Sequence, residues 1–136
     1  MNICSIILVL LLSFFNNTTS YFAEGKATYY ADRMHGQRTA SGDRYDKKQL
    51  TAAHATLPFN TLVQVTNLKN GKSVIVKIND RKAKSRHIII DLSRAAAEEI
   101  GLIRDGITTV KLTEVEKEEE KQQDIPLAVS EAGKRS

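Results

Sequence analysis

The sequence is almost without cysteine: its 136 residues contain one, Cys4, close to the N-terminus. With a single cysteine, a small exported domain held together by disulfide bonds is excluded. Only three residues precede Cys4, and no apolar run lies before it. A lipid-modified cysteine of the bacterial lipoprotein type is therefore excluded as well, and we expect no lipid anchor.

Charged side chains are absent from the first twenty residues. Residues 5–15 form an unbroken run of apolar residues and serine. A membrane-spanning helix needs about twenty such residues, whereas a run of this length is typical of the apolar part of a signal peptide. The small residues that a signal peptidase needs follow at Thr18 to Ser20. We expect residues 1–20 to be a signal peptide, with an uncleaved N-terminal anchor as the alternative.

Large apolar residues are also few in the last 23 residues, 114–136, which hold seven acidic and four basic side chains. We expect a charged tail there, disordered or forming a frayed helix. The 93 residues between, 21–113, are predicted to form one domain, with 16 Lys and Arg against 9 Asp and Glu, a net charge of +7. This charge suits an anionic partner or serves solubility alone. Nucleic acid is not predicted, because the basic residues form neither a stripe nor a recognised motif.

The apolar pattern of this domain has mostly period two, which is typical of β-strands. Two β-branched runs are joined through Asn70-Gly71, which predicts a β-hairpin whose two turn residues both have positive φ. A short helix is predicted with Asp91 or Ser93 as its N-cap and with its end at Gly101. The predicted strands cover residues 24–30, 61–67, 72–80, 88–91 and 107–115, and the helix covers residues 91–101. A mostly β chain with one helix is typical of an antiparallel barrel or sandwich.

Two further features of the pattern point to function. The stretch 31–49 is polar and has no periodic apolar face, and a loop that long in a compact domain is usually functional or disordered. In the strand predicted at 72–80, Val74, Val76 and Ile78 share one face, and counting on by two places Asp80 on the same face. A carboxylate that continues a core stripe must be hydrogen-bonded, ion-paired or placed for chemistry.

Several classes of site are absent from the sequence. The three histidines, at 35, 54 and 87, lack the spacing of a metal site, and no metal or other cofactor is predicted. There is no G-x-S-x-G and no phosphate-binding glycine loop. What remains is a set of carboxylates, Asp43, Asp46, Asp80 and Asp91. A pair of carboxylates is the minimum equipment for cleaving a glycosidic bond. The alternatives are an ion pair of Asp80 with Arg81 and a capping role for Asp91.

The order of several motifs identifies a resemblance that covers about Gly25 to Lys111. These motifs are G-x-A-T-Y-Y, H-G-x-x-T-A-S-G-D-x-Y-D, L-T-A-A-H-x-T-L-P, V-T-N-L-x-N-G, N-D-R and I-D-L-S-x-A-A-A. In this order they closely resemble the rare lipoprotein A family, the septal-ring lytic transglycosylases of bacteria. The resemblance implies a mainly β fold, a six-stranded double-psi β-barrel with one short helix. It also implies an exported endolytic enzyme of the periplasm or cell envelope that cleaves peptidoglycan glycan strands to 1,6-anhydromuramic ends.

The resemblance also implies roles for individual residues. The aspartate of N-D-R is Asp80, the expected general acid. The second family acid follows T-A-x-G and is usually glutamate; here it is Asp43, one methylene shorter, which puts its position in doubt. Substrate contacts are expected at His54, Thr39, Tyr45 and Arg81, although His54 is alternatively a core histidine and Tyr45 a packing residue.

Two departures from the family pattern leave alternatives open. Lys82-Ala83 stands where many members have Gly-Pro, which predicts a different loop beside the acid. We expect no glycan-targeting domain after the barrel, so a preference for peptide-stripped glycan is not implied. A glycan-binding or wall-loosening module without catalysis remains a second hypothesis, because the fold alone does not imply catalysis. A third is an interaction protein that binds division or cell-wall proteins.

Overall fold

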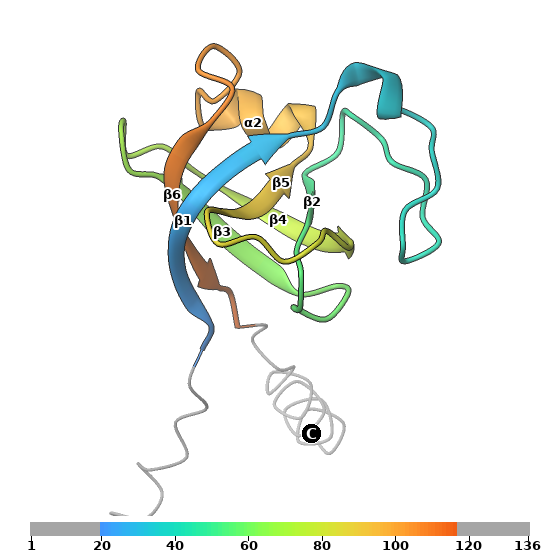
Figure 1. The fold of residues 1–136 in the computed structure, drawn as a ribbon, viewed down its shortest axis with the longest axis horizontal. Helices are drawn as coiled ribbons and strands as arrows, with labels where there is room; N and C mark the ends of the chain where they lie inside the picture. Colours follow the sequence, from blue (N-terminus) through green and yellow to red (C-terminus); the bar gives the residue numbers. More distant parts are fainter. Residues whose placement is uncertain (1–19, 117–136) are drawn as a thin grey trace, which may run out of the picture.

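The computed structural model describes residues 20–116 as one closed β-barrel (Figure 1). Most of the predicted signal peptide, 1–20, and of the predicted tail, 114–136, lies outside these residues. The elements are β1 (Phe22–Tyr29), a short 3₁₀ helix η1 (Asp32–Met34), β2 (Thr51–Ala53), β3 (Leu62–Asn67), β4 (Ser73–Asp80), β5 (Ile88–Leu92), α2 (Arg94–Glu99) and β6 (Thr108–Glu114). Within the described residues no helix is long and apolar enough to cross a membrane.

The six strands close the barrel in the order β1-β5-β2-β4-β3-β6. Four of the pairings are antiparallel, but β1 pairs with β5, and β2 with β4, in parallel. The sequence pattern alone favours an antiparallel sheet, and for these two pairs that expectation is wrong. Both parallel pairs join strands that are not consecutive in the chain, so local periodicity carries no information about them.

Strand β2 is not predicted by the apolar pattern. It has three residues, two of them alanine, which is a weak strand former. All three are buried, because β2 lies between β4 and β5 and is paired on both edges. Its extended form is therefore set by its neighbours in the barrel.

The core fills the barrel with aliphatic side chains that alternate along the strands, as the period-two pattern predicts. Its fully buried strand residues include Val63, Val65, Val76, Ile78, Ile90, Leu92, Val110 and Leu112. Helix α2 and the turn after it close one end through Ala96, Ala97, Ile100 and Leu102. Ser93 caps the helix by accepting a hydrogen bond from the Ala96 N–H at 3.2 Å, so of the two predicted N-caps the structure selects Ser93.

The β3–β4 hairpin differs from its predicted turn. Gly71 has a φ of 76°, but Asn70 does not have positive φ. The turn closes with a bond from the Gly71 N–H to the Asn67 carbonyl at 2.8 Å, so four residues form the loop and only the last is left-handed. The Asn70 side chain instead donates to the Ile100 carbonyl at 3.0 Å and ties the hairpin to the end of α2.

A β-bulge interrupts β4 just before its end. The pairing with β2 passes from Ala52↔Ile78 to Ala53↔Asp80, so that Asn79 is an extra residue. Ile78 and Asn79 are both buried, and the alternation along the strand is broken. Counting by two from Ile78 therefore does not give the orientation of Asp80. Bulges redirect a side chain in this way at the rims of barrels.

Candidate active site

A groove of about 450 Å³ lies where β1, β2, β4 and β5 end or approach their ends. The residues that line it include Thr28, Tyr30, Ala53, Asp80, Arg81 and Asp91. It thus holds two carboxylates, of which only Asp80 was predicted to be catalytic. Neither Asp43 nor His54 lines it.

The carboxylate of Asp80 is held by three hydrogen-bond donors. Its Oδ1 accepts from the backbone N–H of Ala40 and from that of Arg81, both at 2.8 Å. Its Oδ2 accepts from the hydroxyl of Tyr30 at 2.5 Å. The side chain is only partly buried, so a fixed carboxylate faces an open groove.

Ala53 lies between the two carboxylates of the groove. It pairs with Asp80 across the parallel β2–β4 ladder and with Asp91 across the antiparallel β2–β5 ladder. Adjacent strands are about 4.8 Å apart, so the backbones of Asp80 and Asp91 are separated by roughly 10 Å, two strand spacings. Ala53 forms the floor of the groove between the two carboxylates, and because its side chain is only a methyl group, it fills little of the groove.

Asp91 is fixed from its other side by β1. Thr28 is its register partner across the parallel β1–β5 ladder, and the Thr28 hydroxyl donates to Asp91 Oδ1 at 2.6 Å. The predicted capping role of Asp91 passes to Ser93, which leaves the Asp91 carboxylate to the groove.

Tyr30, which directly follows β1 and belongs to the G-x-A-T-Y-Y motif, is part of the site although no role was predicted for it. Its ring stacks on that of Tyr45, with centroids 4.4 Å apart and planes 17° from parallel. Burial is the main cause that raises its pKa well above the usual value, and the hydrogen bond to Asp80 and the charges of Asp80 and Asp91 raise it further. Tyr30 therefore keeps its proton at any physiological pH.

Tyr45 lies behind the groove wall. It is 3% exposed, and its hydroxyl accepts from the Arg94 N–H at 3.0 Å. Of the two readings of Tyr45, the geometry favours packing over substrate contact. Thr39 is also buried, and its hydroxyl donates to the Asp43 carbonyl at 2.7 Å, which shapes the turn of the polar loop.

Asp43 lies in that turn and is exposed. Its backbone carbonyl accepts from the Thr39 N–H at 2.7 Å, but no hydrogen bond or ion pair holds its carboxylate among residues 20–116. The turn itself docks on the end of β4, because Ala40 donates to Asp80 and Ser41 donates to the Asn79 carbonyl at 3.3 Å. Through its backbone, this turn therefore helps to fix Asp80.

His54 is a buried residue, 4% exposed, with both ring nitrogens engaged. Nδ1 accepts from the N–H groups of Thr56 and Leu57, both at 3.1 Å, so the ring proton lies on Nε2 and faces the Tyr21 hydroxyl at 3.2 Å. Burial, together with the charges of Arg81 and Lys82, lowers the pKa of His54, so the ring is neutral. This geometry favours the core alternative and leaves no ring atom for substrate.

Arg81 lines the groove in a fixed position. Its guanidinium lies 4.3 Å from the centroid of the Phe59 ring and donates to the His54 carbonyl at 3.1 Å. Lys82, in the Lys82-Ala83 pair that departs from the family pattern, donates from Nζ to the carbonyls of Ala83 and Ile88, each at 2.9 Å. The lysine side chain thus links the start of the loop after Asp80 to the first residue of β5.

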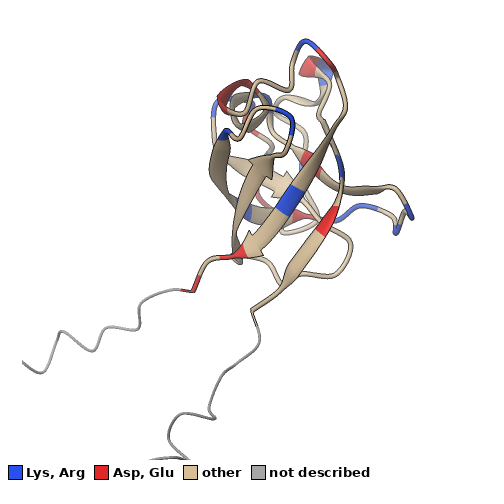
Figure 2. Ribbon diagram, turned by 90° about the vertical axis from the view of Figure 1, so that its left-hand side faces the viewer, with Lys and Arg blue, Asp and Glu red and all other residues tan. Residues whose placement is uncertain are grey.

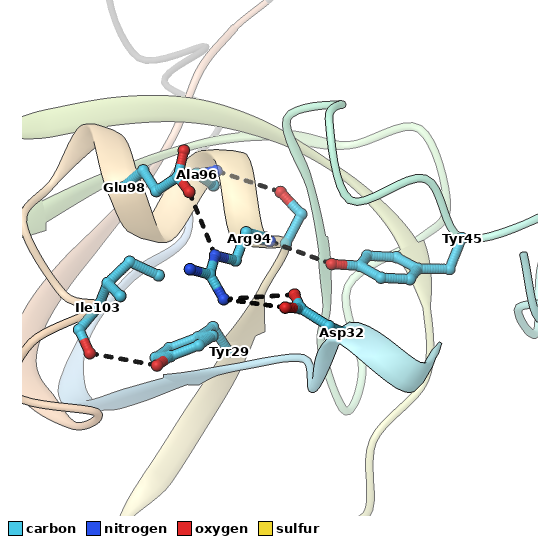
Figure 3. A network of polar contacts seen from close by, with 8 residues as sticks. Tyr29, Asp32, Tyr45, Arg94, Ala96, Glu98 and Ile103 are labelled. Carbon is cyan, nitrogen blue, oxygen red and sulfur yellow. Dashed lines mark hydrogen bonds and ion pairs between the residues drawn. The ribbon is translucent and has the colours of Figure 1, made fainter. Parts of the chain in front are cut away.

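The long polar loop is anchored to α2 by a network shown in Figure 3. Arg94 donates to the carboxylate of Asp32 at 3.3 Å and to that of Glu98 at 3.1 Å, and its N–H binds Tyr45. The Tyr29 hydroxyl donates to the Ile103 carbonyl at 3.2 Å in the same region. The loop predicted to be functional or disordered is therefore an ordered part of the site.

Charge around the barrel is mixed in sign, with basic and acidic residues interspersed in the view of Figure 2. The loop after Asp80 is an exception: residues 81–87 contain Arg81, Lys82, Lys84 and Arg86 and no acidic residue, and the first three residues of this loop line the groove. No group of three or more potential metal ligands occurs in the described part of the chain.

Comparison with known proteins adds the family to this geometry. A sequence profile of the family described as lytic transglycolase matches residues 22–112, from the first residue of β1 into β6. The chain belongs to this lytic transglycolase family. The predicted resemblance to rare lipoprotein A proteins and the predicted double-psi barrel are confirmed.

Members of the family with curated names include two close relatives. The endolytic peptidoglycan transglycosylase RlpA of Haemophilus influenzae is 55% identical over 97 residues, which cover 71% of this chain and 34% of that protein. RlpA of Neisseria meningitidis serogroup A is 45% identical over 100 residues, covering 74% and 42%. The chain thus spans less than half the length of these relatives.

Solved structures that superpose on this barrel include proteins that are not named transglycosylases. The Streptomyces papain inhibitor superposes with a TM-score of 0.57 at 26% identity and covers 71% of this chain and 96% of its own. The apo expansin of Clavibacter michiganensis superposes with a TM-score of 0.59 at 19% identity, covering 73% and 52%. The second likeness shows the fold alone.

Two residues of the site in this lytic transglycolase domain, Tyr30 and Thr28, had no predicted role. Both belong to the G-x-A-T-Y-Y motif at the end of β1, so the motif was the available indication. What each hydroxyl binds depends on how β1 lies against β4 and β5, which no local pattern specifies.

Proposed function

We propose that the protein is an exported lytic transglycosylase of the cell envelope that cleaves the glycan strands of peptidoglycan. The observation that carries this proposal is Asp80, a carboxylate fixed by three donors at an open groove that also holds Asp91. Membership of the lytic transglycolase family and the names of the RlpA relatives support it.

The proposed reaction begins with Asp80 as general acid. Asp80 donates its proton to the glycosidic oxygen as the C1–O bond of the muramic residue breaks. The 6-hydroxyl of the same sugar then bonds to C1, and its proton passes to Asp80. The product is a 1,6-anhydro end, no water is consumed, and Asp80 returns to its starting protonation state.

A second carboxylate would stabilise the positive charge that develops on the sugar ring, because fixed negative charge beside a cationic transition state lowers its energy. Two residues are candidates for this role. Asp43 is the position implied by the family pattern, whereas Asp91 lines the groove beside Asp80. We propose Asp91 for this role and keep Asp43 as the alternative.

The other residues support substrate binding or the shape of the site. Arg81 lines the groove with a fixed guanidinium and is the proposed contact for hydroxyl or carboxylate oxygens of the glycan. His54 holds the turn at Thr56 and Leu57 and, through its carbonyl, holds Arg81, so we propose a positioning role for it.

The experiment is digestion of purified peptidoglycan, intact and peptide-stripped, with mass spectrometry of the soluble products. We expect 1,6-anhydromuramic ends from the wild-type protein. Asp80→Asn keeps the size of the side chain but removes the proton, and it should lower the rate by about a thousandfold or more. Asp105→Asn, which removes an exposed ion pair with Lys69, is the matched control and should act like the wild type.

A second candidate function is a glycan-binding or wall-loosening module without bond cleavage. The observation that favours it is the exposed Asp43 where the family usually has glutamate. In that case the wild-type protein would pellet with insoluble peptidoglycan and release no products. The Asp80→Asn variant would bind the peptidoglycan as well as the wild type does. Reducing ends in place of anhydro ends would instead indicate hydrolysis and contradict the transglycosylase step.

A further inference from the structure

The hydrogen bonds that the Asp80 carboxylate accepts limit the oxygen lone pairs at which it can carry a proton. A carboxylate has four lone-pair sites, two on each oxygen. Both sites of Oδ1 are occupied by the Ala40 and Arg81 N–H groups, which can only donate. One site of Oδ2 is occupied by the Tyr30 hydroxyl, so within the described residues one site, on Oδ2, stays open.

Tyr30 is held firmly enough to fix that oxygen. Its ring stacks on Tyr45, and Tyr45 is in turn fixed by the Arg94 N–H. Because burial and the neighbouring carboxylates raise the pKa of Tyr30, its hydroxyl is a permanent donor in the working pH range of an enzyme. The phenol can orient a carboxylate without exchanging its own proton.

We infer that Tyr30 is a positioning residue whose hydroxyl holds Oδ2 of Asp80 and confines the transferable proton to the open site of that oxygen. This inference rests on the proposed function, in which Asp80 is the general acid. The proton leaves Oδ2 for the glycosidic oxygen as the C1–O bond breaks, and the proton of the 6-hydroxyl returns to Oδ2. Tyr30 gains and loses nothing, so no further reactant is needed.

Other charged groups also face this carboxylate and must stay constant in a test. Asp91 of β5 faces it across Ala53, and Arg81 and Lys82 follow it in the next loop. Arg33 of η1 lines the same groove. None of these is altered by substituting Tyr30, so a change in pH dependence would report on the single bond to Oδ2.

The test compares Tyr30→Phe with Thr108→Val. Both variants lose one hydroxyl and one hydrogen bond, but the hydroxyl of Thr108 donates to Asn67 Oδ1, and neither Thr108 nor Asn67 lines the groove. The rate of anhydro-product formation is measured against pH, with kcat and KM separated on soluble glycan. Thermal unfolding of each variant checks that it is folded.

For Tyr30→Phe we expect kcat to fall about tenfold with little change in KM, because the acid loses its orientation. The alkaline limb of the pH profile should move up by about one pH unit, since the ionised acid loses a charge-assisted hydrogen bond and its protonated form persists to higher pH. Thr108→Val should stay within about twofold of the wild type, and the alkaline limb of its pH profile should not move.

An unmoved alkaline limb in a folded Tyr30→Phe variant, or a change confined to KM, would overturn the inference. If that variant does not fold, NMR of the wild-type protein replaces it. The Tyr30 hydroxyl proton should then be protected and shift with the same midpoint as the activity, and a rapidly exchanging, pH-insensitive signal would overturn the inference. A wild-type protein that forms no anhydro ends would contradict the proposed function itself, whereas the NMR readout still tests the hydrogen bond.

Discussion

Asp91 belongs to a barrel strand, whereas Asp43 belongs to a turn of the loop that precedes β2. The position of Asp91 follows from the pairing of β5 with β1 and β2 and from the Thr28 hydroxyl. The Asp43 turn is held by backbone hydrogen bonds, and its side chain is exposed. The loop thus holds the Asp80 carboxylate through its backbone, while its own carboxylate, that of Asp43, is exposed to solvent.

The sharpest test of this comparison is Asp91→Asn. The amide keeps an oxygen that accepts from Thr28 but removes the negative charge beside the sugar. We expect kcat to fall about a hundredfold, a typical loss for one electrostatic stabiliser in a groove. Steady-state kinetics on peptide-stripped glycan would measure this, and a rate within a few-fold of the wild type would return the second acid to Asp43.

A change between the two strand acids should have a smaller effect. Ala53→Val raises the floor between Asp80 and Asp91, and we expect KM for glycan to rise about tenfold, because the added methyl groups occupy space in the groove. Ala53→Ser is the matched control, since it adds one small atom. An unchanged KM in folded Ala53→Val would mean that the glycan does not cross this floor.

The smallest effect is expected at Asp43. Asp43→Asn should keep activity within about threefold, because an exposed carboxylate interacts weakly through water. Asp43→Glu restores the usual family residue and should likewise change little. A loss of a hundredfold in Asp43→Asn, with a folded protein, would establish Asp43 as the second acid and reverse the comparison.

Much of the barrel was predictable because its strands carry their own pattern. The runs ending at Asn67 and starting at Ser73 alternate β-branched and polar residues, and Ser93 and Gly101 bracket the helix with known capping chemistry. Strand β2 was not predictable from its pattern, because two of its three residues are alanine and its form depends on strands on both sides.

The candidate site was predictable only at Asp80 and Arg81, both through the N-D-R motif. The pairing of Ala53 with both acids joins three strands that are far apart in the sequence, so no spacing along the chain reveals it. The tautomer and hydrogen bonds of His54 could not be predicted either, because the partners of its ring nitrogens lie in the turn after it and at Tyr21, just before β1.

The bulge at Asn79 has a consequence for how the family can vary. The direction of Asp80 depends on the number of residues between Ile78 and the end of β4, and much less on which residue occupies position 79. Exchange of Asn79 for another residue can leave the acid in place, whereas deletion of Asn79 would remove the bulge, and with it the local bend and twist of β4 that orient Asp80. Members of this family should therefore tolerate substitutions beside Asp80 more readily than changes in length.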